Sequence, residues 1–162
     1  MTFTLRQFTP EDAPQVLALN AQSVHFLSPL DAPKLARLAD ASDLFWVLEY
    51  QQAVVGFVIG FGAGRAYESI NYRWFNARLQ RFLYIDRIVL SDAVRGQGQG
   101  QAVYKALVAW AQAHEYHWLA AEIDIAPANP ASLKFHQQQG FIAVGEQGVG
   151  SKRVSLQLRP LG

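Results

Sequence analysis

The strongest constraint on the fold is the segment Arg95–Gly100, which reads Arg-Gly-Gln-Gly-Gln-Gly and has three glycines in six residues. The stretch before it, Phe82–Leu90, is rich in β-branched and aromatic residues, which predicts a strand. After it, apolar residues recur every three or four positions between Val103 and Ala111, which predicts a helix with one apolar face. The chain therefore turns from a strand into a helix through glycines, as mixed α/β proteins do.

A turn of this kind can hold an anion. The first N–H groups of a helix have no partner inside the helix, and the helix dipole favours negative charge beside them. Glycines let the backbone approach a phosphate closely, and Arg95 can add a two-pronged contact. The alternative is a plain strand-to-helix turn that uses glycine for tight packing, and the loop alone leaves both interpretations open.

Two common nucleotide-binding loops fit the segment poorly. A P-loop ends in Gly-Lys-Ser/Thr, whereas Gly100 is followed by Gln101. A Rossmann fingerprint has its third glycine one residue later than Gly100 and normally opens its domain, whereas about 90 residues precede this loop. These two classes of binding site are therefore disfavoured.

The rest of the chain predicts a mixed α/β sheet in a single domain, residues 1–162, which is long enough to bury a sizeable core. Residues 62–81 have the least regular pattern and predict a long loop, and loops of that length are often functional. Gly145, Gly148 and Gly150 are expected around the turn of a closing hairpin. The other expected strands are 3–8, 44–50, 53–61 and 118–125, the hairpin strands are 141–144 and 154–158, and the other expected helices begin at Thr9, Lys34 and Pro130.

Composition narrows the classes of partner. A formal net charge of +1 gives no support for a nucleic-acid binder, because such proteins usually gather a basic excess on one face. The chain has no cysteine, which excludes disulfides, thiolate metal ligands and a cysteine nucleophile, and no metal site is expected. The start shows no signal-peptide pattern, and the longest apolar run, Ala53–Gly64, is shorter than the roughly 20 residues of a membrane span. A cytoplasmic protein without membrane association is the expectation.

Two ordered motifs resemble one known family, the GNAT superfamily of acetyl-CoA-dependent N-acetyltransferases. Its signature after a strand is Arg or Gln, two residues, Gly, one residue, then Gly or Ala, which fits Arg95–Gly100. About 30 residues later, Asn129–His136 followed by Gly140-Phe141 resembles the family's second motif. The resemblance covers the C-terminal half and is strongest to a bacterial subgroup. It implies a mixed, mostly antiparallel central sheet flanked by helices, and transfer of an acetyl group from acetyl-CoA to a primary amine.

The resemblance also implies a coenzyme A site. The backbone of Ile88, Val89 and Leu90 would bond the pantetheine arm, and Asn129, Ser132 and Phe135 would contact the coenzyme from the last helix. Asn129, Ser132 and His136 lie at i, i+3 and i+7 and so share one helical face, which supports a common ligand surface independently of the family. The pyrophosphate would be held by Arg95, Gly96, Gln97, Gly98, Gln99, Gly100 and Gln101.

Proton transfer needs candidates of its own. Asp86 is the first candidate for the base that deprotonates the amine, because it shares a strand face with Ile88 and Leu90. Glu122, which shares a face of the next strand with Asp124, is the second candidate. The alternative for Asp86 is an ion pair with a nearby arginine, and the arginines considered are Arg73, Arg78 and Arg81.

His136 stands where the resembling family usually has a tyrosine that protonates the leaving thiolate. Histidine can donate a proton near neutral pH, so the same role is a hypothesis here. The alternative is an exposed surface histidine on a glutamine-rich helix.

The acceptor amine would belong to a small molecule or a peptide. Its pocket is expected between the aromatic residues Tyr67 and Tyr72 of the long loop and the first helix-loop region with Asn20 and His25. A peptide N-terminus, a lysine, an amino acid, a polyamine and an antibiotic all remain open as acceptors. A non-catalytic module that binds acyl-CoA as a regulatory ligand is the alternative function, and the edge of the C-terminal hairpin makes a homodimer a possible assembly.

Overall fold

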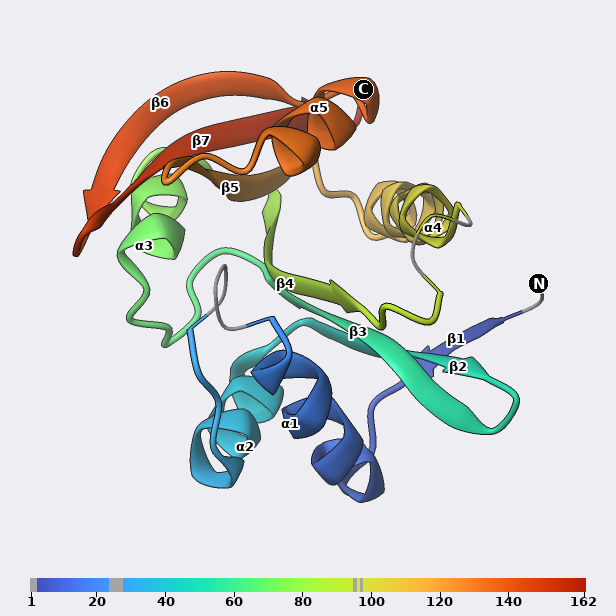
Figure 1. Ribbon diagram of the computed structural model, residues 1–162. Coiled ribbons are helices and arrows are strands. Elements are labelled where there is room, and N and C mark those ends of the chain that lie inside the picture. The colour runs from blue at the N-terminus through green and yellow to red at the C-terminus, as the bar shows by residue number, and fades with distance from the viewer. Residues whose placement is uncertain (1–2, 24–27, 95, 97) are drawn as a thin grey trace. The chain divides into compact units, whose positions relative to one another are not determined.

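The computed structural model describes residues 3–23, 28–94, 96 and 98–162 of the chain. The described residues form one seven-stranded sheet with the strand order β1-β2-β3-β4-β5-β7-β6 and five α-helices (Figure 1). The expected mixed, mostly antiparallel sheet with flanking helices is therefore confirmed. The strands are β1 (Thr4–Gln7), β2 (Leu44–Tyr50), β3 (Ala53–Phe61), β4 (Phe82–Leu90), β5 (Trp118–Ala126), β6 (Ile142–Val149) and β7 (Lys152–Pro160), and the helices are the short 3₁₀ helix η1 (Pro10–Asp12), α1 (Ala13–Ala21), α2 (Ala32–Ala41), α3 (Ile70–Asn76), α4 (Gln99–Ala113) and α5 (Pro130–Gln138).

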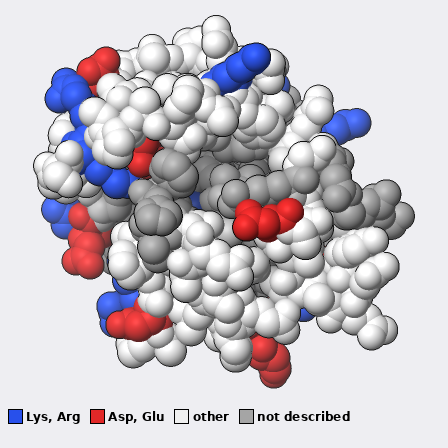
Figure 2. All heavy atoms as spheres, in the orientation of Figure 1, with Lys and Arg blue, Asp and Glu red and all other residues white. Residues whose placement is uncertain are grey.

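The chain divides into two compact units, and β4 and α4 each contribute residues to both. The first unit comprises Met1–Phe61 and Ile85–Ala102, and the second comprises Gly62–Tyr84 and Val103–Gly162. On the face shown in Figure 2, basic and acidic side chains are interspersed and most of the surface is uncharged. No helix in the described part of the chain is long and apolar enough to cross a membrane.

The first unit is built on the antiparallel strands β1, β2 and β3, with α1 and α2 packed beside β3. The predicted β2–β3 hairpin is confirmed, and its two turn residues, Gln51 and Gln52, have φ values of 50° and 65°. Two-residue hairpin loops need such left-handed values to match the twist of the flanking strands. The predicted helix start at Thr9 is also confirmed, since the Thr9 N–H donates to the Asp12 carboxylate at 2.9 Å before η1 leads into α1.

The end of β4 lies tightly against β3 in the first unit. A Cβ atom added to Gly56 would lie 2.7 Å from the carbonyl oxygen of Val89, so only glycine allows this approach. Just beyond, the Ser91 N–H donates to the Val55 carbonyl at 2.7 Å. The glycine in β3 therefore determines where the last residues of β4 lie.

The second unit contains a helix that the sequence pattern misses, because residues 62–81 are expected to form a loop. Helix α3 begins after Ser69, whose hydroxyl accepts a hydrogen bond from the Tyr72 N–H at 3.3 Å. Tyr72 and Phe75, one turn apart, pack their rings on Phe82 at the start of β4. A seven-residue helix has too few turns for a clear periodicity and is stabilised mainly by such tertiary packing.

The closing hairpin is longer than expected. Gly145 and Gly148 lie inside β6, so their assignment to the turn is wrong, whereas Gly150 does lie in the turn with a φ of +60°. A Cβ atom at Gly145 would lie only 2.9 Å from the Trp74 ring of α3. The glycine that suggested a turn instead marks the place where a helix side chain packs against a strand.

Candidate active site

The turn after β4 has the backbone expected of an anion-binding loop. Gly96 and Gly98 have φ values of +76° and +82°, a left-handed conformation that side chains other than glycine adopt only at a cost. Among the described residues, no neighbouring atom lies within 4 Å of a Cβ atom built on either glycine. These two glycines therefore serve the backbone conformation, which argues against the tight-packing alternative. Arg95 and Gln97 lie outside the described residues.

Helix α4 begins directly after this turn. The helix runs for 15 residues from Gln99, and the Ala102 N–H donates to the Gly98 carbonyl at 3.1 Å to close its first turn. Gln99 is buried, Gly100 is half-buried and Gln101 is exposed. The positive end of the helix dipole is therefore next to the glycine turn, as required for an anion. Ile88, Val89 and Leu90 form the last three residues of β4, immediately before the turn.

Asp86 forms the ion pair that was one of its two interpretations, but with a different arginine. Its Oδ2 atom lies 2.9 Å from Nε of Arg87, and the two side chains are only 6% and 3% exposed. Arg87 is not among the arginines considered from the sequence, Arg73, Arg78 and Arg81. Arg87 was missed because neighbouring residues of a strand normally point to opposite faces.

Arg87 forms further hydrogen bonds in the first unit, and one of them is to Asn20, a residue expected to contact the acceptor. Its Nη1 atom donates to Asn20 Oδ1 at 3.0 Å and to the Ser28 carbonyl at 2.7 Å, and its Nη2 atom donates to Ser28 Oγ at 2.8 Å. Asn20 is 1% exposed, and its Nδ2 atom also donates to the Ser28 carbonyl. The side-chain oxygen and nitrogen of Asn20 are therefore both hydrogen bonded to residues of the first unit. This gives Asn20 a structural role instead of the expected contact with the acceptor. His25, the other residue expected there, lies outside the described residues.

Tyr67 and Tyr72, both expected to line the acceptor pocket, differ in burial and in their contacts within the second unit. Tyr72 is 1% exposed, donates its hydroxyl proton to the Gly62 carbonyl at 2.6 Å and accepts a hydrogen bond from the Arg65 N–H. It therefore braces the segment before α3, which corrects its assignment to the pocket wall. Tyr67 is half-buried, with its ring centroid 5.6 Å from that of Tyr72, and its contact with the acceptor stays a prediction.

Glu122 and Asp124 share one face of β5, as expected from the strand periodicity, but their surroundings differ. Asp124 is buried and pairs with the Lys152 ammonium group at 3.1 Å. Glu122 is half-buried and accepts a 2.6 Å hydrogen bond from the hydroxyl group of Tyr84, which is fully buried. Spacing along the sequence did not reveal either partner, because both come from other strands.

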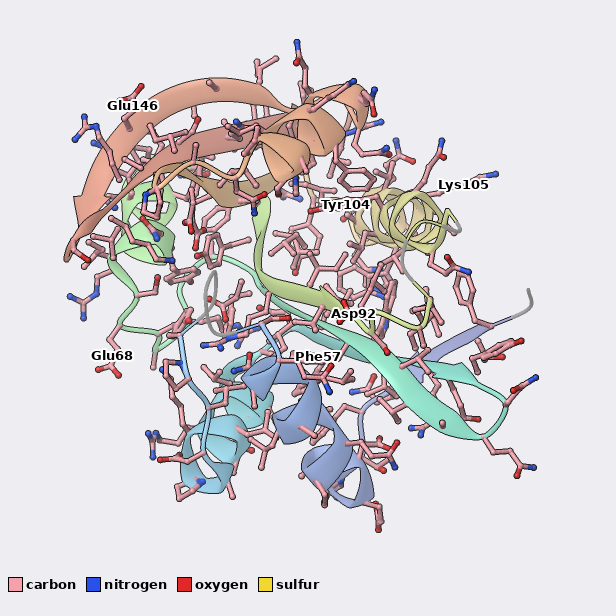
Figure 3. All side chains as sticks on the ribbon, viewed as in Figure 1. Phe57, Glu68, Asp92, Tyr104, Lys105 and Glu146 are labelled. Carbon is pink, nitrogen blue, oxygen red and sulfur yellow. The ribbon has the colours of Figure 1, made fainter. Side chains whose placement is uncertain are left out.

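His136 is buried, so its interpretation as a surface histidine is wrong. Its Nδ1 atom lies 2.8 Å from the Ser132 carbonyl, which can only accept, so Nδ1 carries the proton. Nε2 then accepts the Tyr104 hydroxyl proton at 2.7 Å. Tyr104 lies on α4 and points away from its exposed neighbour Lys105 (Figure 3).

Burial changes the acidity of both partners in this pair. Burial lowers the pKa of His136, so the ring is neutral near pH 7. Burial and the nearby charge of Glu122 raise the pKa of Tyr104 well above its usual range. A neutral histidine with both ring nitrogens engaged has a structural role in α5, and this geometry does not favour it as the acid for the leaving thiolate.

The start of α5 gathers the other residues of the second motif. Asn129 caps the helix, with its Oδ1 atom accepting from the Ser132 N–H at 3.3 Å, and Ser132 contacts His136 through both its carbonyl and its hydroxyl oxygen. Phe135 is half-buried and packs against Tyr104 with ring centroids 5.7 Å apart. The predicted common face of Asn129, Ser132 and His136 is therefore present, and contact of Asn129, Ser132 and Phe135 with a coenzyme stays a prediction.

The buried histidine predicts a particular pH dependence of stability. The folded-state pKa of His136 lies below the ordinary histidine value of 6.5, so the unfolded chain binds the extra proton first as the pH falls. The free energy of unfolding should therefore be fully retained above pH 6.5 and decline below it, by up to about 1.4 kcal/mol per pH unit. Urea denaturation between pH 7 and pH 5 measures this slope, which His136→Phe should flatten.

The exposed residue His114 provides the control for that slope. His114→Gln should retain the wild-type decline, because it leaves the buried pair of His136 and Tyr104 in place. An equally steep decline in His136→Phe would assign the pH dependence to another group.

The sequence and the fold are both similar to known proteins. The family model described as the acetyltransferase (GNAT) family matches residues 11–141. None of the curated proteins matches the sequence closely enough to count as a relative. Among solved structures, Ard1 from Thermoplasma volcanium is 17% identical in sequence and has a TM-score of 0.80. The match covers 99% of this chain and 98% of the Ard1 chain.

Two further solved structures have the same fold. An N-acetyltransferase from Staphylococcus aureus is 20% identical with a TM-score of 0.73 and covers 100% of both chains. The N-acetylglutamate synthase from Neisseria gonorrhoeae, complexed with coenzyme A and N-acetylglutamate, is 14% identical with a TM-score of 0.74. The match covers 100% of this chain but only 36% of the synthase chain.

Proposed function

Because the chain belongs to the acetyltransferase (GNAT) family, we propose that it moves an acetyl group from acetyl-CoA to a primary amine of a small molecule or peptide. The observation that carries the proposal is the turn after β4. Its two left-handed glycines face open space at the start of a long helix. Backbone N–H groups at such a helix start can bind the negatively charged pyrophosphate.

We assign coenzyme A to residues of three elements. The backbone of Ile88, Val89 and Leu90 in β4 bonds the pantetheine arm, and the turn through Gly96, Gly98 and the start of α4 holds the pyrophosphate. The end of β4 is rigidly placed by its contact with Gly56, which supports a role in aligning the thioester. In the first unit, the other residues proposed to contact the coenzyme are Arg95, Gln97, Gln99, Gly100 and Gln101. In the second unit, Asn129, Ser132 and Phe135 keep the coenzyme contact that the family resemblance implies.

The reaction is the direct attack of a neutral amine on the thioester carbonyl carbon. A C–N bond forms, and the carbonyl oxygen becomes an oxyanion stabilised by a backbone N–H of β4. The carbonyl then re-forms as the C–S bond breaks and coenzyme A leaves as a thiolate. The nitrogen gives up its extra proton to solvent, and the thiolate takes one from solvent. Such an oxyanion donor contributes about 3 kcal/mol in other enzymes. A lysine-like amine must first lose a proton, which costs about 4.6 kcal/mol at pH 7, so a base is needed.

We assign the base to Glu122 in place of the first candidate, Asp86. The Asp86 carboxylate is paired with the Arg87 guanidinium, and a proton added to it would break that buried ion pair. Glu122 accepts a hydrogen bond from a neutral hydroxyl, which it can keep as a partner after it has taken a proton.

Thiol release tests the function. Incubation with acetyl-CoA and a panel of peptides, amino acids, polyamines and aminoglycosides should give free thiol only when a suitable amine is present. A variant with Gly96→Ala and Gly98→Ala should raise KM for acetyl-CoA at least tenfold, since each left-handed alanine costs about 1 kcal/mol. Acetyl-CoA binding without thiol release for any amine would favour the regulatory module, and no binding would contradict both functions.

A further inference from the structure

We propose that Tyr84 is a positioning residue that holds Glu122 ionised and correctly oriented to take a proton from the acceptor amine. The inference rests on the proposed function, and all of its geometry lies within the second unit. The Tyr84 hydroxyl donates to Glu122 Oε2 at 2.6 Å, a short distance typical of a hydrogen bond to a charged carboxylate. Tyr84 is fully buried, so its hydroxyl is held in place.

The strand register brings the two residues together. The pairing of β4 with β5 is parallel and includes Tyr84 opposite Ala120. Glu122 follows Ala120 by two residues, so it lies on the same face of the sheet as Tyr84 and within diagonal reach. Both side chains project from paired strands, which limits their movement and fixes the direction of the carboxylate.

The Tyr84 ring is fixed by an aromatic cluster. It packs edge-on against Tyr72 at a centroid distance of 5.7 Å and at a tilt against Phe75 at 5.9 Å, and both residues belong to α3. Glu122 is half-buried, and partial withdrawal from water disfavours the charged form of a carboxylate. A donated hydrogen bond from the hydroxyl opposes that effect and keeps the carboxylate available as a base at neutral pH.

Comparison with the other two acids on these strands shows why a tyrosine suits a base. Asp86 is paired with Arg87 and Asp124 with Lys152, and both partners are cations that can only donate. A hydroxyl group donates to an ionised carboxylate and can accept from a protonated one. Tyr84 can therefore stay bonded to Glu122 before and after proton transfer, whereas an ion pair would resist the transfer.

The ionised Glu122 carboxylate also affects a second tyrosine. The charge contributes to raising the pKa of the buried Tyr104 hydroxyl, which lies on α4 and is bonded to His136. The carboxylate therefore lies close enough to this hydrogen-bonded pair to act on it electrostatically, and it does so only while it is ionised.

Tyr84→Phe tests the inference through the pH profile of thiol release. Loss of one hydrogen bond to the ionised carboxylate should move the acid limb of kcat/KM to higher pH by about one unit, or tenfold in activity at the low-pH end. The plateau at high pH should change much less, because Glu122 is ionised there without help. Circular dichroism checks that the variant is folded.

A titration without substrate separates this inference from the proposed function. In protein labelled with ¹³C at the glutamate carboxyl carbons, the Glu122 signal, assigned by its loss in Glu122→Gln, should titrate at higher pH in Tyr84→Phe than in wild type. An unchanged titration would overturn the role of Tyr84 even if thiol release is confirmed. A shifted titration without any thiol release would support the effect of Tyr84 on Glu122 ionisation and would overturn the proposed acetyl transfer.

Tyr72→Phe is the matched control for both measurements. It removes another buried hydroxyl of the same cluster, one bonded to the Gly62 carbonyl. Its stability should fall, but the acid limb and the Glu122 titration should stay at their wild-type positions. Equal shifts in both variants would indicate a general effect of the cluster and would contradict a specific role for Tyr84.

Discussion

Glu122→Gln is expected to lower kcat/KM for the acceptor amine by about 10²–10⁴-fold near pH 7, the usual contribution of a general base. The amide has the same shape, and its oxygen can still accept the Tyr84 hydrogen bond, but it cannot take a proton. The loss should shrink as the pH rises toward the pKa of the free amine, about 10.4 for a lysine-like acceptor, because solvent then supplies the neutral amine. Thiol release from pH 6 to pH 10 measures both effects.

Two controls sharpen this result. The affinity for acetyl-CoA, measured by calorimetry, should be the same in wild type and Glu122→Gln, because the assigned coenzyme contacts lie elsewhere. Glu146→Gln changes a 55% exposed side chain on β6, which Figure 3 labels, and it should keep wild-type turnover. A loss of less than tenfold in Glu122→Gln would assign the base to another group.

Arg87→Met should lower the free energy of unfolding by about 3–5 kcal/mol, the usual cost of breaking a buried ion pair from one side. The substitution removes the cation beside Asp86, whose side chain is only 6% exposed, and the donor to the Ser28 carbonyl. Methionine has a similar length and hydrophobic packing, so most of the loss comes from the missing charge and hydrogen bonds. Urea denaturation at pH 7 measures it.

The exposed pair Arg153–Glu146 is the matched control for this ion pair. The two side chains are 54% and 55% exposed, and the N–O distance of 3.0 Å is close to the buried one. Arg153→Met should therefore cost about 1 kcal/mol or less. The double variant Asp86→Leu/Arg87→Met should recover part of the loss, since no charge is left buried. Equal losses in Arg87→Met and Arg153→Met would contradict the structural role of the buried arginine.

Local patterns were sufficient to predict most strands and the glycine turn. The hairpin of β2 and β3 and the strand β4 have the bounds expected from their runs of β-branched and aromatic residues. Gly96 and Gly98 adopt the left-handed backbone that only glycine reaches cheaply, so a short motif was enough to predict the loop. These features depend on residues within a few positions of one another, which is the range that a sequence pattern reports.

The chemistry of the candidate site depended on contacts between distant residues. Glu122 and Tyr84 are 38 positions apart, and only the parallel register of β4 and β5 places one hydroxyl against one carboxylate. The sequence left open whether His136 is a surface histidine or a proton donor, and the fold buries it with Tyr104 hydrogen bonded to it.

The sequence by itself therefore determined the family, the order of the strands and of every α-helix except α3, and the glycine turn proposed for the pyrophosphate, because these follow from local conformation and short motifs. The tertiary structure decided which acids pair with cations, which tyrosine hydroxyl braces the backbone, and which carboxylate accepts a hydrogen bond from a neutral hydroxyl. The physical reason is that burial and hydrogen-bond partners set the protonation of a side chain, and both depend on residues that meet only in the folded chain.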